Sequence, residues 1–280
     1  MSIAHKKILV YLALVFVFSA VFYYIMITTG SISGYTFPLM GCPAVAAILT
    51  QLLFQRNLRG LGWGRGQAKY WWMGYGLPIL YCLVVYSIVW VTGLGRVDLM
   101  VFMQQSASLV DLPIHSPILY LIGYVAIMTT VVLAVGSVQA LGEEIGWRGF
   151  LVPTLYQEHS FTQTSVISGV IWVIWHSPLI LFADYNNTGA PRWFGLLCFV
   201  VMVMGVSFVF AWLRLRSGSL WPVVLLHASH NLFVQMVFTP LTLDTGYTAY
   251  VIDEFGIGLA LALALLGYLF WRQRGAVSAS

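Results

Sequence analysis

Uninterrupted runs of apolar residues constrain this chain more than any other feature. The first run extends from Ile8 to Thr28 without a charged residue, and a helix needs about 20 apolar residues to cross the hydrocarbon core of a bilayer. Inside lipid, every backbone N–H and C=O must be paired within its own segment or within a closed barrel. A barrel strand would alternate polar and apolar residues over about 10 positions, and this run does not alternate. The runs therefore predict transmembrane helices.

Stretches of this kind, bounded by charges, glycines and prolines, divide the whole chain. Eight are found, near residues 8–28, 37–54, 71–93, 117–142, 164–183, 193–213, 219–240 and 254–271. Only 8% of the 280 residues are charged, against roughly 25% in an ordinary soluble domain, and the segments between the stretches are too short to form a core of their own. We expect one all-α integral membrane domain over residues 1–280, a polytopic helical bundle of about eight spans.

The basic residues predict how this bundle is oriented. Eleven of the 13 Lys and Arg residues fall at one end: Lys6, Lys7, Arg56, Arg59, Arg65, Lys69, Arg148, Arg214, Arg216, Arg272 and Arg274. Only Arg96 and Arg192 fall at the other. Because positive residues stay on the cytoplasmic side, we expect both termini in the cytoplasm. The net charge of +4 then follows from topology and from attraction to anionic headgroups of the bilayer, and no nucleic-acid partner is expected.

Ionisable side chains within or beside the apolar stretches are few, and they are candidate functional residues. An ionisable group in a membrane span costs about 2.5–3.5 kcal/mol on insertion scales. With one neighbouring amide, these groups form three clusters: Glu143, Glu144 and Arg148 at the end of the fourth stretch, His176 in the fifth, and His227, His230 and Asn231 in the seventh. All of them fall within residues 140–235.

Helical spacing separates the two adjacent glutamates. Glu144 and Arg148 are four residues apart, in the order that favours an ion pair along a helix. Glu143 is turned by ~100° from Glu144 around the helix axis. The two carboxylates therefore should not have the same role.

The same spacing groups the polar residues of the seventh stretch. His227 and Asn231 are four apart, so only ~40° separates them and they share one face. His230 flanks that face and points either into a site or against a neighbouring helix, so its role stays open.

Each cluster alone also has a structural explanation. A buried ion pair neutralises charge in a low dielectric, and polar side chains hold membrane helices together by hydrogen bonds. Taken jointly, however, a glutamate, histidines and an asparagine on three helices form a hydrolytic constellation.

The three clusters also form ordered motifs. They read Glu-Glu-x-x-x-Arg at 143–148, aromatic-x-x-x-His at 172–176 and His-x-x-x-Asn at 227–231. In this order they resemble the CAAX prenyl protease and bacteriocin-processing enzyme family, also called the CPBP or Abi family, of intramembrane proteases. The resemblance covers residues 140–235, and the first half of the chain supports it only as a hydrophobic scaffold. One departure is Trp172, where the family often has Phe.

The resemblance implies a role for each motif residue in peptide-bond hydrolysis. Glu143 would be the base that activates water, and His176 would help to hold or polarise that water. His227 and Asn231 would form the oxyanion hole. The remaining charged residues of the first motif would orient Glu143 and set its charge. General chemistry agrees, because hydrolysis needs a base within reach of a water and donors directed at the tetrahedral oxygen.

Three alternatives remain open from the residues alone. Glu143, His176 and His227 would also make the ligand set of a zinc hydrolase, although the chain has no H-E-x-x-H and Asn231 suits an oxyanion donor better than a metal ligand. We therefore favour chemistry without a metal or other cofactor. Intramembrane Glu and His residues also relay protons in transporters, but the expected repeat between halves is not seen. The third alternative is a non-catalytic membrane scaffold.

The substrate is predicted only by class. The resemblance implies either a lipidated, prenylated CAAX protein or a bacterial peptide, leader or membrane protein. The compact loops favour a prokaryotic-type member in the plasma membrane. Because the Glu143 end of the fourth helix falls on the predicted cytoplasmic side, we expect the active site to face the cytoplasm.

Overall fold

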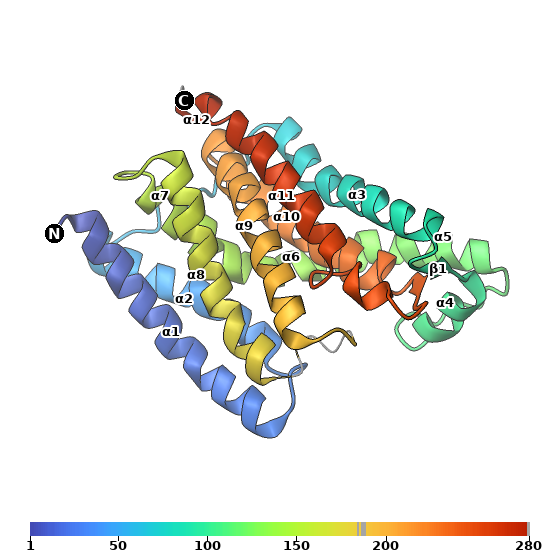
Figure 1. Cartoon of the computed structure of the whole chain (residues 1–280). Helices are drawn as coiled ribbons and strands as arrows, with labels where there is room; N and C mark the ends of the chain where they lie inside the picture. The colour runs from blue at the N-terminus through green and yellow to red at the C-terminus, as the bar shows by residue number, and fades with distance from the viewer. Residues whose placement is uncertain (184, 186–188, 279–280) are drawn as a thin grey trace.

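The computed structural model describes residues 1–183, 185 and 189–278, and its described part is predominantly helical (Figure 1). Its longer helices are α1 (Ile3–Thr29), α2 (Thr36–Gln55), α3 (Ala68–Val91), α5 (Pro117–Ile127), α6 (Leu133–Glu144), α8 (Phe161–Phe182), α9 (Arg192–Ser217), α10 (Trp221–Asn231) and α11 (Ile257–Arg272). Short helices are α4 (Leu99–Ser106), α7 (Val152–Leu155) and α12 (Gly275–Ser278), with a 3₁₀ turn, η4 (Thr248–Tyr250). Two two-residue strands, β1 (Arg96–Val97) and β2 (Thr242–Leu243), pair antiparallel.

Three π-helical segments continue these helices: η1 (Met128–Val132), η2 (Ile145–Leu151) and η3 (Leu232–Phe238). Through η1 and η2, the fourth helix becomes one element of 39 residues, from Pro117 to Leu155. The predicted end at residue 142 is therefore wrong. The helix continues because the polar groups that follow residue 142 have partners inside the protein: Glu143 accepts from two indole groups, and Glu144 pairs with Arg148. Single π turns are frequent at functional sites.

The predicted all-α membrane bundle is confirmed. Within the described residues, six helical segments are long and apolar enough to cross a membrane: Ile3–Thr29, Thr36–Gln55, Ala68–Val91, Pro117–Leu155, Phe161–Phe182 and Arg192–Ser217. The seventh predicted stretch is helical through α10 and η3, and the eighth is the 16-residue α11. The count of eight spans, the single domain and the cytoplasmic termini stay predictions.

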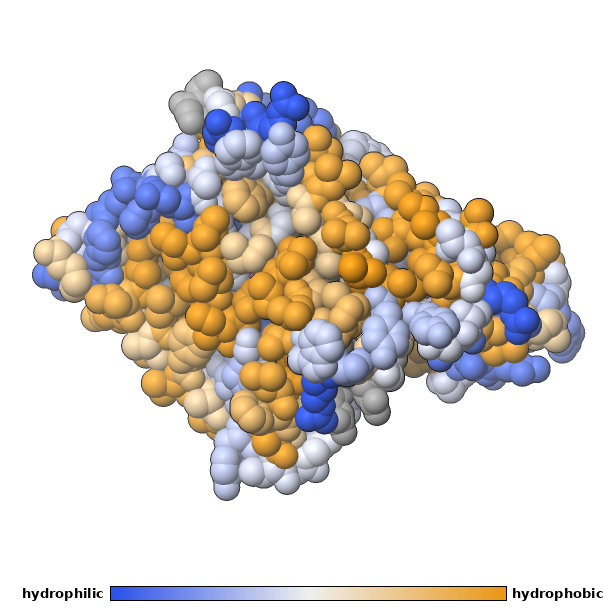
Figure 2. All heavy atoms as spheres, viewed as in Figure 1, coloured by the Kyte–Doolittle hydropathy of each residue, from blue (hydrophilic) through white to orange (hydrophobic). Residues whose placement is uncertain are grey.

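The two ends of the chain lie at the same end of the bundle, at the upper left of Figure 1. Figure 2 shows a broad hydrophobic surface between more hydrophilic ends, as expected for a protein surrounded by lipid. Helix α9 lies inside the bundle and contacts α8, α10 and α11. It approaches α11 closely at Gly205, where an added Cβ would lie 2.3 Å from the carbonyl oxygen of Leu263. Small residues allow membrane helices to pack this tightly.

Candidate active site

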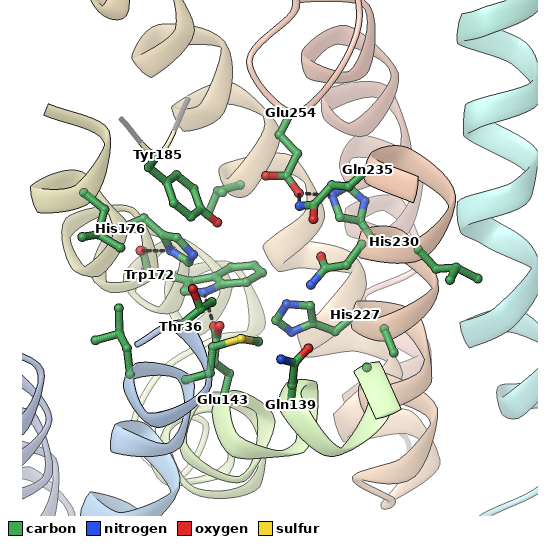
Figure 3. Close-up of a pocket in the computed structure, with 18 of the residues that line it drawn as sticks. Thr36, Gln139, Glu143, Trp172, His176, Tyr185, His227, His230, Gln235 and Glu254 are labelled. Carbon is green, nitrogen blue, oxygen red and sulfur yellow. Dashed lines mark hydrogen bonds and ion pairs between the residues drawn. The ribbon is translucent and has the colours of Figure 1, made fainter. Parts of the chain in front are cut away.

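A cavity of about 510 Å³ lies among α2, α6, α8, α9, α10 and η3 (Figure 3). Most of its wall is apolar, with a few polar groups facing inward, which is the usual character of a ligand site. The five motif residues Glu143, His176, His227, His230 and Asn231 all line it. Side chains separated by up to 88 residues in the sequence, from 143 to 231, are thus brought to one cavity by three helices.

Glu143 is held by two indole groups. The side chain is 2% exposed, and its Oε2 accepts hydrogen bonds from Nε1 of Trp147 at 3.2 Å and Nε1 of Trp172 at 2.9 Å. No side chain in the described part of the protein donates to its Oε1. One carboxylate oxygen is therefore fixed, and the other is available to a molecule in the cavity.

Glu144 faces away from this pair and forms a separate buried network. Its Oε1 accepts from Nη1 of Arg148 and from Nδ1 of His227, both at 2.8 Å. The guanidinium carbon of Arg148 lies 4.0 Å from the ring centres of both Trp172 and Phe210, in two cation–π contacts. The two glutamates thus have different partners, as their spacing predicts. The ion pair of Glu144 and Arg148 contacts His227 and not Glu143, which is oriented by the two indole groups.

The two catalytic-type histidines have defined hydrogen positions. His176 Nδ1 lies 3.1 Å from the carbonyl oxygen of Trp172, and a carbonyl can only accept, so this nitrogen carries the hydrogen. His227 Nδ1 likewise donates to the Glu144 carboxylate. In both rings Nε2 is then left for the cavity. His227 can donate from Nε2 only when its ring is protonated.

Asn231 lies one helical turn after His227 and lines the same cavity, as their spacing predicts. None of the described side chains forms a hydrogen bond with its amide. The amide is therefore available to a ligand.

His230 has a different set of contacts. Its Nδ1 lies 2.5 Å from the hydroxyl of Tyr81, and its Nε2 lies 3.1 Å from Oε1 of Glu254. Glu254 also lines the cavity, at the end opposite Glu143 in Figure 3. Sequence reasoning did not identify Tyr81 or Glu254, because both are distant in sequence from the motifs. It also missed Trp147 as a partner of Glu143, although the spacing of four residues was a usable signal.

The cavity extends away from the end of the bundle that carries the termini. Glu143 lies at its inner end, and the α6 residues that line it, such as Gly136, all precede Glu143. Ser33 and Gln235 line its wall and are exposed on the molecular surface. The helix continues past Glu143 on the side of the termini. The side of the membrane that the active site faces stays a prediction.

A buried arginine lies at the same end of the site. Nε of Arg214 donates to the carbonyl oxygen of Arg148 at 2.9 Å, and its Nη2 donates to that of Gly60 at 3.2 Å. The loop of residues 56–67 is thereby held over η2, with Leu61 1% exposed. This end of the site is sealed by protein.

The alternative of a zinc site needs three protein ligands grouped around one position. In residues 1–183, 185 and 189–278, no three His, Cys, Asp or Glu side chains are grouped closely enough to hold a metal ion.

Comparison with known proteins agrees with the motif order. The family described as type II CAAX prenyl endopeptidase, Rce1-like, matches residues 124–233. Over 141 residues the chain is 28% identical to CAAX prenyl protease 2 of Methanococcus maripaludis, an alignment that covers 48% of this chain and 49% of that protein. Residues 124–233 are thus similar to the Rce1-like CAAX protease family.

The Rce1-like match contains all three motifs, from Glu143 to Asn231, whereas Tyr81 and Glu254 lie outside it. The chain spans about half the length of the curated CAAX prenyl protease 2 that it matches. The apolar helices and the similarity to this family together identify an integral, multi-pass membrane protein.

Proposed function

We propose that the protein is an intramembrane endopeptidase in which Glu143 activates the attacking water. The observation that carries this proposal is the asymmetric carboxylate of Glu143. One oxygen is fixed by Trp147 and Trp172, and the other faces a cavity that also receives His176 and Asn231. A base that holds water must lie within hydrogen-bond reach of it, and fixing one oxygen orients the other.

The proposed reaction proceeds through a tetrahedral intermediate. Glu143 takes a proton from water as the water oxygen bonds to the carbonyl carbon, and Nε2 of His176 helps to hold that water. The carbonyl oxygen becomes an oxyanion that accepts from the amide of Asn231 and from Nε2 of protonated His227. Collapse breaks the C–N bond, and Glu143 returns its proton to the leaving amine. Donors placed at the developing charge contribute most to such reactions.

Glu144 and Arg148 are positioning residues in this scheme. The carboxylate of Glu144 fixes the ring of His227 through Nδ1 at 2.8 Å, as an acidic partner fixes a catalytic imidazole in other hydrolases. Arg148 compensates the charge of that carboxylate. No metal takes part in this proposal.

The substrate is proposed to be a peptide or a membrane-protein segment that enters from the bilayer or from the side on which the cavity opens. The basic end of the bundle and the cavity mouth lie at opposite ends. With the basic end cytoplasmic, the mouth faces the non-cytoplasmic side of a prokaryotic plasma membrane. A cysteine placed at Ser33 should then react with a membrane-impermeant maleimide in intact cells, and a cysteine at Arg56 should react only after lysis. The reverse result would overturn this orientation.

The proposal is tested by purifying wild-type protein, Glu143→Gln and Asn231→Ala and offering each a library of internally quenched peptides, with and without a chelator. Loss of the base should lower hydrolysis roughly 10²–10⁴-fold, and loss of one oxyanion donor roughly 10²–10³-fold. Glu158→Gln is the matched control, because Glu158 pairs with His5 away from the cavity. Full activity in Glu143→Gln would refute the proposal. Loss of activity on chelation would favour the zinc mechanism, and no hydrolysis by any protein would favour a scaffold.

A further inference from the structure

The connection between α2 and α3 carries a cluster of basic side chains that the proposed reaction does not use. We call residues 56–69 the basic segment; it covers the loop after α2 and the first residues of α3, at the end of the bundle that carries the termini (Figure 1). Its four cations are all exposed: Arg56, Arg59, Arg65 and Lys69. In the described part of the chain, none of the four forms an ion pair with a carboxylate. The protein therefore supplies no anion of its own to this cluster.

The backbone of the basic segment turns its carbonyl groups towards the protein. Between residues 59 and 65, six carbonyl oxygens accept hydrogen bonds from other parts of the chain: those of Arg59, Gly60, Gly62, Trp63, Gly64 and Arg65. The donors come from four helices and from the turn before α10: Gln51, Trp71, Arg214, Ser219, Leu220 and Trp221. The hydrogen-bond acceptors of this backbone are thus occupied from inside.

The N–H groups of the same backbone have no such partners. Residues 63–67 are exposed, and no described group accepts a hydrogen bond from their backbone N–H groups. At Gly64 an added Cβ would meet no atom within 4 Å, so another molecule can approach the backbone there closely. Successive backbone N–H groups form anion-binding sites in proteins. The basic segment therefore offers both free backbone donors and unpaired cationic side chains to an anion.

Tryptophan side chains indicate where this surface lies in the membrane. Trp63 is 40% exposed and Trp72 is 73% exposed, and the ring of Trp63 packs against that of Trp221 with ring centres 6.5 Å apart. Tryptophan is enriched at the headgroup level of a bilayer. The anion present at that depth is the phosphate of a phospholipid, and a guanidinium binds phosphate through two parallel N–H groups.

We propose that the basic segment is a binding site for the phosphate of an anionic phospholipid headgroup. Membrane topology by itself accounts for an excess of positive residues at this end, but it does not account for a backbone whose carbonyl groups are all bonded inward while its N–H groups are free. The site is separate from the cavity of Glu143 and does not depend on the proposed peptidase activity. A lipid that binds only the folded chain stabilises it, and Arg214 joins the segment to η2 by donating to both Gly60 and Arg148.

Binding is measured by native mass spectrometry of the full chain in a neutral detergent, titrated with phosphatidylglycerol or with phosphatidylcholine, in which choline compensates the phosphate charge. The wild-type protein should bind phosphatidylglycerol at least about tenfold more tightly, because basic residues at a membrane surface favour anionic lipids. Arg59→Gln/Arg65→Gln should weaken the binding of phosphatidylglycerol by about tenfold or more. It should also reduce the rise in unfolding temperature that this lipid causes.

The matched control is Arg272→Gln/Arg274→Gln. This variant removes the same charge from two exposed arginines at the same end of the bundle, outside the basic segment. It should change the affinity for phosphatidylglycerol by less than about threefold, because exposed charges away from the site are screened. Equal losses in the two double variants would show a general attraction between charges and would overturn the site.

Three other results would also overturn the proposal: equal binding of the two lipids, no binding of either lipid, or binding unchanged in Arg59→Gln/Arg65→Gln. An excess of inorganic phosphate separates the two sources of the anion. Displacement of phosphatidylglycerol by inorganic phosphate would assign the segment to the free ion and refute a lipid site, whereas undisturbed lipid binding supports it. Peptide hydrolysis does not enter this measurement, so a failure of the proposed endopeptidase would leave the result unaffected.

Discussion

Removing the guanidinium of Arg148 should destabilise the protein, because the variant leaves the carboxylate of Glu144 buried without its cation. Both side chains are 0% exposed and their atoms lie 2.8 Å apart. Breaking a buried pair by removing one partner typically costs about 3–5 kcal/mol. The hydrogen bond from His227 to the same oxygen remains, so we expect the lower value, about 3 kcal/mol, for Arg148→Met. At roughly 2–4 °C per kcal/mol, the unfolding temperature should fall by about 6–12 °C.

The double variant Glu144→Gln/Arg148→Met separates charge from volume. It removes both charges but keeps an acceptor for His227, and replacing a buried pair by neutral residues is often harmless. Its unfolding temperature, followed by tryptophan fluorescence in detergent, should recover at least half of the loss. Arg216→Met is the control, because Arg216 is partly exposed and should stay within about 0.5 kcal/mol of wild type. A harmless Arg148→Met, or a double variant no more stable than the single, would refute this account of the buried pair.

Three further predictions follow from the packing, the site and the loop before α11. Gly205→Ala should lower the free energy of unfolding by about 1–3 kcal/mol through overpacking. The control Gly41→Ala, whose added Cβ meets no atom within 4 Å, should not lower it. Equal effects of the two substitutions would contradict the close packing of α9 on α11. Trp172→Phe removes one donor to Glu143 and should lower peptide hydrolysis by about tenfold, the lower end of a charged hydrogen bond, while an unchanged rate would show that the remaining indole suffices. Burial, and secondly the charge of Glu254, raises the pKa of Asp253 from 3.8 to about 6. The folded state therefore binds this proton more tightly than the unfolded state, and the free energy of unfolding should fall as the pH rises from about 4 to about 6. Asp253→Asn should make this fall smaller when the unfolding temperature is measured over a series of pH values.

The motif residues that share a helix face were predictable because helical spacing is a local property. His227 and Asn231 share a face whatever surrounds them, and both line the cavity. The hydrogen-bond partners of Glu144 were only half predictable. Its ion pair with Arg148 is local, but its contact with His227 joins residues 83 positions apart and depends on how two helices are rotated against each other. A sequence motif therefore identifies Glu144 and His227 but does not show that their side chains form a hydrogen bond.

The role of Trp172 shows the same limit. In the sequence it is an aromatic residue where the family often has Phe, a difference that alters little in an apolar helix. In the structure its N–H donates to Glu143 and its ring stacks on Arg148. The N–H contact distinguishes Trp from Phe, and both contacts exist only because α8 packs against η2, the segment that follows Glu144.

By itself, the sequence determined that this chain is a helical membrane protein and which residues form the three motifs, because the hydrophobic effect and helical periodicity act on neighbouring residues. Only the tertiary structure decided that Trp147 and Trp172 orient Glu143, that Glu254 joins the cavity from beyond the motifs, and that the cavity opens away from the termini. These features depend on contacts between helices, and in lipid such contacts are selected by close packing and hydrogen bonding, which apolar patterns do not encode.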